Sequence, residues 1–114
     1  MRKLLVPIVL VLAGGLPAVF TASAPSATRV KVGDNYFVRS SGVPTVTVAK
    51  GTRVKWYWAG DSLHNVKTVS GPARFGSSSM MRGSYAKKVR ERGTYTIVCT
   101  VHGASDQKMK LVVE

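Results

Sequence analysis

The chain has 114 residues, with 17 Lys or Arg and 5 Asp or Glu, and its formal net charge is +12. This length is enough for one domain, and a single cysteine excludes both an intrachain disulfide and a structural zinc site built from several thiolates. With 45% hydrophobic residues, the composition is that of a folded domain rather than a disordered basic tail. The excess of basic residues is compatible with a nucleic acid, a membrane surface or an acidic protein as partner.

The first residues have the layout of a secretory signal. Arg2-Lys3 is followed by the apolar run Leu4–Ala13, and the segment ends in the small residues Ala22–Ala24. A membrane-spanning helix needs about 20 apolar residues, which is more than this run supplies. We therefore predict that residues 1–24 are a signal peptide, cleaved within a few residues of that boundary, and that residues 25–114 are one domain. Without the two leading cations this domain keeps 15 basic and 5 acidic residues, a net charge of +10.

The rest of the chain is typical of short β-strands. In the segment Arg53–Trp58, Val54, Trp56 and Trp58 fall on one face, and charged or polar residues fall on the other. Many such alternating runs, separated by Gly, Ser, Pro and Asp clusters, predict an all-β sandwich or barrel. The expected strands are Thr28–Val32, Val46–Ala49, Arg53–Trp58, His64–Val69, Ser84–Arg90, Thr94–Cys99 and Lys108–Val113.

The side chains that can bind a transition metal include the only cysteine and the only two histidines. Cys99 ends a predicted strand on the same face as Ile97, so its thiol points into the domain. His102 follows three residues later, and His64 comes after a Gly-Asp-Ser turn. One thiolate and two imidazoles form the trigonal set that selects copper, completed by a weak axial ligand. A lone Cys is more often a buried small hydrophobe, but in an exported protein an unpaired thiol is a liability unless something occupies it.

These residues resemble the cupredoxins, in particular the plastocyanin-like small blue copper proteins. The matching segments are Val54–Trp56, Asp61–Val66, Phe75, Gly83, Gly93–Tyr95, Cys99 with His102, and Met109–Val113. The resemblance implies a Greek-key β-sandwich of the cupredoxin type and one type-1 copper ion. It also implies that His64, Cys99 and His102 are the copper ligands, and that Asn65 ties the two ligand loops together.

The fourth ligand departs from the family pattern, in which a Met usually follows the last histidine closely. Gln107 is five residues after His102, and Met109 comes two residues later on the same strand face. Two strand residues span about 6.6 Å, so these two side chains cannot both approach one copper. Alignment of the last strand with the family places Gln107 at the axial position, as in stellacyanin-like members. We predict an axial Gln107 above a core Met109, with Met109 as the alternative ligand.

The resemblance implies an exported, periplasmic or extracellular type-1 copper protein that carries single electrons and is not an enzyme. Its partners would be a redox donor and acceptor with acidic surfaces, and we expect a monomer with no stable membrane insertion after signal cleavage. An extracytoplasmic copper carrier or scavenger with the same site is the alternative. A Cys–His hydrolase would need a third group to orient its base. A nucleic-acid partner is disfavoured because the basic residues are scattered over every predicted strand and because the protein is exported.

Overall fold

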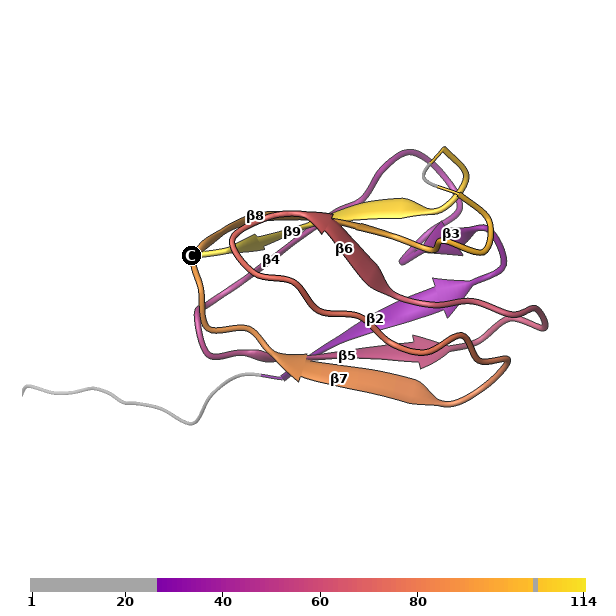
Figure 1. The fold of residues 1–114 in the computed structure, drawn as a ribbon, viewed down its shortest axis with the longest axis horizontal. Helices are drawn as coiled ribbons and strands as arrows, with labels where there is room; N and C mark the ends of the chain where they lie inside the picture. Colours follow the sequence, from indigo (N-terminus) through magenta and orange to yellow (C-terminus); the bar gives the residue numbers. More distant parts are fainter. Residues whose placement is uncertain (1–26, 104) are drawn as a thin grey trace, which may run out of the picture.

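The computed structural model describes residues 27–103 and 105–114, and this part of the chain consists of eight β-strands and their connections (Figure 1). The predicted signal peptide, residues 1–24, lies outside the described residues. Within them, no helix has the length and apolar character that crossing a membrane would need. The strands are β2 (Ala27–Gly33), β3 (Tyr36–Phe37), β4 (Thr45–Val48), β5 (Arg53–Trp58), β6 (Lys67–Ser70), β7 (Ser84–Lys88), β8 (Gly93–Val98) and β9 (Lys108–Val113).

The strands form two four-stranded sheets. One has the order β3-β2-β5-β7 and the other the order β4-β9-β8-β6. The pairs β2 with β5 and β4 with β9 are parallel, and the remaining neighbours are antiparallel. Figure 1 shows the two sheets as separate layers joined by loops at both ends. The predicted all-β sandwich is therefore confirmed.

The core fills the space between the two sheets because each strand alternates apolar and polar side chains. On β5, Val54 and Trp56 are fully buried, while the intervening Lys55 is exposed. Trp56 packs against Phe75, with ring centroids 5.9 Å apart, and Phe75 packs in turn against Tyr95 of the opposite sheet at 5.7 Å. Burial of one such large side chain stabilises a fold by about 1.5–3 kcal/mol. This aromatic contact across the layers holds the two sheets together.

Two segments differ from the expected strands by more than two residues at an end. The strand expected over His64–Val69 begins only at Lys67, because His64 pairs with Met80 through a single isolated bridge. The backbone N–H of His64 donates to the Met80 carbonyl at 3.0 Å, and the Met80 N–H donates back at 2.9 Å. The other difference is β3, Tyr36–Phe37, which was not expected because two residues are too few to show alternation. The segment that carries His64 is thus a loop that pairs with the Met80 segment through one bridge only.

Candidate metal centre

Three potential metal ligands meet at one end of the sandwich. His64 lies in the loop between β5 and β6, whereas Cys99 and His102 lie in the loop after β8. The ligand atoms of the three side chains lie within 4.8 Å of one another. The Cys99 Sγ atom is 3.9 Å from Nδ1 of His64 and 3.5 Å from Nδ1 of His102. His64 and Cys99 are fully buried, and His102 is half-buried.

The loop after β8 brings Cys99 and His102 together by a tight turn. Tyr95 and Ile97 point into the core, and Cys99 continues this alternation at the end of the strand. The Gly103 N–H then donates to the Cys99 carbonyl at 2.9 Å, which reverses the chain direction. Gly103 has a φ of 87°, in the left-handed region that glycine occupies without steric cost. The turn places both His102 and the thiol on the metal-binding side.

The spacing of the three donors fits a first-row transition metal. Bonds of about 2.0 Å to a ring nitrogen and about 2.3 Å to a thiolate, at a trigonal angle, separate nitrogen from sulfur by about 3.7 Å. The observed separations of 3.9 Å for His64 and 3.5 Å for His102 lie on either side of this value. A thiolate with two imidazoles is also the donor set that suits copper in both of its oxidation states.

Asn65 joins the two ligand loops. Its side-chain Nδ2 donates to the hydroxyl of Thr100 at 2.8 Å, and its Oδ1 accepts the Thr100 backbone N–H at 2.8 Å. Asn65 follows His64 directly, and Thr100 follows Cys99 directly. Two short hydrogen bonds therefore connect the residues adjacent to two of the donors, so the loops cannot separate without breaking both bonds.

Gln107 is fully buried, and its backbone is hydrogen-bonded to the backbone of Cys99. Its carbonyl accepts the Cys99 N–H at 3.1 Å, and its side-chain Nε2 donates to the carbonyls of Gly33 at 3.0 Å and Tyr36 at 2.8 Å. Carbonyl oxygens accept only, so these two contacts fix the amide nitrogen on their side. The amide oxygen Oε1 is buried and has no hydrogen-bond partner among the described residues. Met109 is also fully buried, but it is paired with Ile97 in the β8–β9 ladder.

Asp34 belongs to the site, although no sequence pattern pointed to it. Its Oδ1 lies 2.8 Å from Nε2 of His64, and its carboxylate also accepts the backbone N–H groups of Asp61 and Ser62 at 3.1 Å. These bonds, that of His64 foremost, lower the pKa of Asp34 to about 2. The residue lies in the turn between β2 and β3, 30 residues before His64, and no local spacing relates the two.

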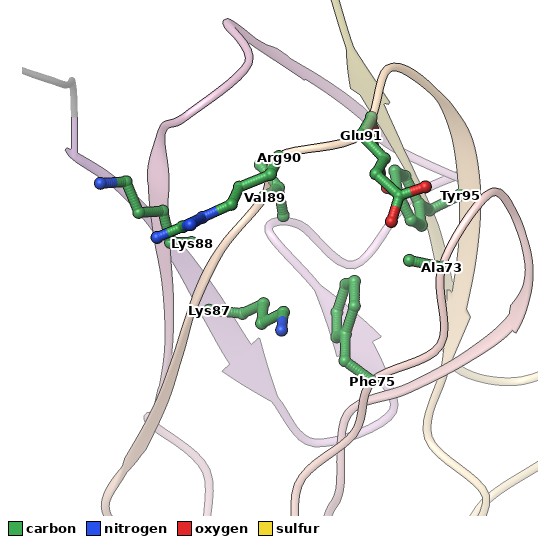
Figure 2. Close-up of a pocket in the computed structure, with 8 residues that line it drawn as sticks. All are labelled: Ala73, Phe75, Lys87, Lys88, Val89, Arg90, Glu91 and Tyr95. Carbon is green, nitrogen blue, oxygen red and sulfur yellow. Dashed lines mark hydrogen bonds between the residues drawn. The ribbon is translucent and has the colours of Figure 1, made fainter.

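A surface cavity of about 360 Å³ lies away from this cluster, toward the start of β8. Figure 2 shows Lys87 and Phe75 at its centre, with Arg90 and Glu91 on the loop above; the Lys87 ammonium lies 5.9 Å from the centre of the Phe75 ring. None of the cysteine or histidine donors lines this cavity. Its walls combine aromatic and cationic groups with the single carboxylate of Glu91, and one carboxylate does not make a metal site.

Comparisons with known proteins agree with this arrangement. A methionine-to-glutamine variant of amicyanin in the Cu(I) state superposes with a TM-score of 0.65 and 29% sequence identity, over 78% of this chain and 83% of the other. An oxidised methionine-to-lysine variant of amicyanin gives a TM-score of 0.64 and 28% identity, over 81% and 86% of the two chains. This chain has the cupredoxin fold. No protein-family model and no curated protein matches the sequence.

The similarity to copper proteins indicates which metal suits the cluster. The His–Cys–His group of this chain is able to bind one copper ion. The oxidised and reduced amicyanin structures that match it share the two-sheet architecture that carries the group.

Proposed function

We propose that this protein is a cupredoxin and an exported electron carrier with a type-1 copper site, in which His64, Cys99 and His102 are the strong ligands. The observation that supports this most directly is the convergence of a buried thiol and two imidazole Nδ1 atoms within 4.8 Å. Bound copper would supply the one-electron chemistry. The protein supplies a donor set held in place by the sheets and loops, so that little rearrangement is needed between oxidation states.

The burial of the donors supports an electron shuttle over a copper carrier. His64 and Cys99 are fully buried, and only His102 is partly exposed. A site that passes its metal to another protein needs open, exchangeable ligands, whereas electron transfer needs only a conducting edge near the surface. The half-buried imidazole of His102 is suited to be that edge.

For the axial position we propose Gln107. Its amide oxygen is buried without a partner, while its nitrogen is taken by the carbonyls of Gly33 and Tyr36. An unpartnered buried oxygen is costly, and coordination of a cation would satisfy it. Met109 instead lies within the β8–β9 ladder as a core residue.

Export and the partners also belong to this proposal. The signal-like segment over residues 1–24 supports a periplasmic or extracellular location, and the cationic character of the domain supports partners with acidic surfaces. The outward face of the sheet β3-β2-β5-β7 is a basic surface of this kind, because the four strands contain no Asp or Glu. The basic residues on this face are Arg29, Lys31, Arg53, Lys55 and Lys88.

Addition of Cu(II) to the purified metal-free protein tests the function. We expect one equivalent of copper to bind with an intense visible sulfur-to-copper charge-transfer band. Cys99→Ser should lose that band, because a serine hydroxyl has no sulfur and is a hard ligand in place of the soft thiolate. Absorption spectroscopy is the measurement, and a colourless native protein would contradict the proposal. Transfer of copper to a chelator that is fast relative to electron exchange would instead identify a carrier.

A further inference from the structure

We propose that Asp34 is a positioning residue for the copper site: its carboxylate holds His64 with Nδ1 turned toward Cys99, and its negative charge favours Cu(II) over Cu(I). This inference rests on the proposed copper function and concerns a residue outside the expected set of ligands. The ring of His64 lies between the two groups, with Nε2 2.8 Å from the Asp34 carboxylate and Nδ1 3.9 Å from Cys99 Sγ.

Two backbone N–H groups also hold the Asp34 carboxylate. Both of its oxygens accept the Asp61 backbone N–H at 3.1 Å, and Oδ1 also accepts the Ser62 N–H at 3.1 Å. At Gly60 a Cβ atom would lie 2.2 Å from Oδ1, so a side chain there would displace the carboxylate. The turn after β2 is thus attached to the loop that carries His64 by hydrogen bonds that do not involve the His64 ring.

The hydrogen bond decides which ring nitrogen is free. An ionised carboxylate only accepts hydrogen bonds, so Nε2 of His64 must carry the hydrogen in the 2.8 Å contact with Asp34. In a neutral imidazole the other nitrogen then has a lone pair, and here that nitrogen is the Nδ1 facing Cys99. Carboxylates that hold metal-bound histidines in this way also raise the basicity of the ligand.

The two histidines differ in their burial and in the contacts of their rings. His64 is fully buried and its Nε2 is bonded to Asp34, whereas His102 is half-buried and no carboxylate bonds to its ring among the described residues. The charge of Asp34 therefore acts through the buried ligand, where solvent screens it less. The Asp34 side chain itself is 42% exposed, so its effect should be moderate.

We expect Asp34→Asn to raise the reduction potential of the copper site. Asparagine keeps the shape of the side chain and an acceptor oxygen for His64, but it removes the charge. Loss of such a partner typically costs about 10–100-fold in metal affinity or activity, and the reduction potential follows the ratio of the Cu(II) and Cu(I) affinities. Because the carboxylate is partly exposed, we expect the lower end of this range: a shift of the Cu(II)/Cu(I) equilibrium of up to about tenfold, equivalent to about 59 mV.

Spectroelectrochemical titration of the copper-loaded protein measures this shift. The matched control is Asp61→Asn, which removes the same charge from the loop of His64, and the Asp61 side chain makes no hydrogen bond to His64. The proposal requires the potential of Asp34→Asn to rise clearly above that of both the native protein and the control. Equal potentials in the two variants would overturn it, because the effect would then be one of net charge alone.

Nitrogen-15 NMR of the metal-free protein tests the positioning separately from copper. In the native chain His64 should show a protonated Nε2 and an unprotonated Nδ1, and Asp34→Ala should give a mixture of the two forms. A native His64 protonated at Nδ1 would overturn the proposal. If the native protein bound no copper, the proposed function would fail, while the NMR result would still decide whether Asp34 positions the ring.

Discussion

Among single residues, Gln107 combines a structural contact with a potential ligand atom. Its amide nitrogen satisfies the carbonyls of Gly33 and Tyr36, which lie at the ends of β2 and β3. The same side chain therefore ties the first sheet to the residue that precedes β9, and its amide oxygen has no hydrogen-bond partner among the described residues. A residue with two such roles cannot be replaced by an apolar one without a cost to both.

Gln107→Met tests the axial assignment. A thioether favours Cu(II) less than an amide oxygen does, so we expect this variant to raise the reduction potential and to change the visible spectrum. The control Met109→Leu should leave both unchanged and lower the free energy of unfolding by less than about 1.5 kcal/mol, because it conserves volume in the core. The opposite result, with Met109→Leu shifting the potential and Gln107→Met leaving it unchanged, would assign the axial position to Met109.

At the scale of the secondary-structure elements, the site depends on two loops that belong to different sheets. The loop between β5 and β6 carries His64, and the loop after β8 carries Cys99 and His102. Regular strand pairing does not join β5 to β8. The relative position of the loops therefore depends on individual contacts, of which the paired hydrogen bonds between Asn65 and Thr100 are the most direct.

Asn65→Ala should loosen this junction. Loss of both hydrogen bonds leaves the Thr100 N–H without its partner, so we expect the free energy of unfolding to fall by about 1–3 kcal/mol. Thr100→Ala removes only the bond to the hydroxyl and should cost about 1 kcal/mol. Chemical denaturation of the metal-free variants measures both. Equal losses in the two variants would show that the Thr100 N–H bond contributes nothing.

At the scale of the whole molecule, the dominant property is positive charge. The domain after the predicted signal has a net charge of +10, and the outward face of the sheet β3-β2-β5-β7 carries basic residues without acidic ones. Two of its cations lie over tyrosine rings, Arg29 over Tyr57 at 4.4 Å and Lys31 over Tyr36 at 5.6 Å. A field of one sign over a whole face steers anionic partners and repels cationic ones.

This charge predicts how electron transfer responds to salt. Oxidation of the Cu(I) protein by hexacyanoferrate(III), an anion, should slow as ionic strength rises, because salt screens the attraction. Reduction of the Cu(II) protein by hexaammineruthenium(II), a cation, should accelerate for the same reason. Stopped-flow rates over a range of salt concentrations provide the measurement. Rates that do not depend on salt would remove the electrostatic argument for acidic partners.

The sequence predicted much of the fold because strand alternation is a local property. The bounds of β5 and β9 match the expected segments, since both strands alternate strictly between buried and exposed side chains. The segment around His64 was predicted less well, because a single bridge to Met80 replaces the pairing of a full strand. The strand β3 escaped prediction for a similar reason: two residues carry no period.

The sequence by itself determined which residues offer metal-binding side chains, because the chain has one cysteine and two histidines and their spacing resembles that of the cupredoxins. Only the tertiary structure decided which other groups surround them. Asp34 contacts His64 across 30 residues, and Gln107 reaches Gly33 across 74. Contacts at such separations arise when sheets and loops pack together, and a local pattern of residues does not encode them. The composition specified the donors, and the packing of the fold specified their environment.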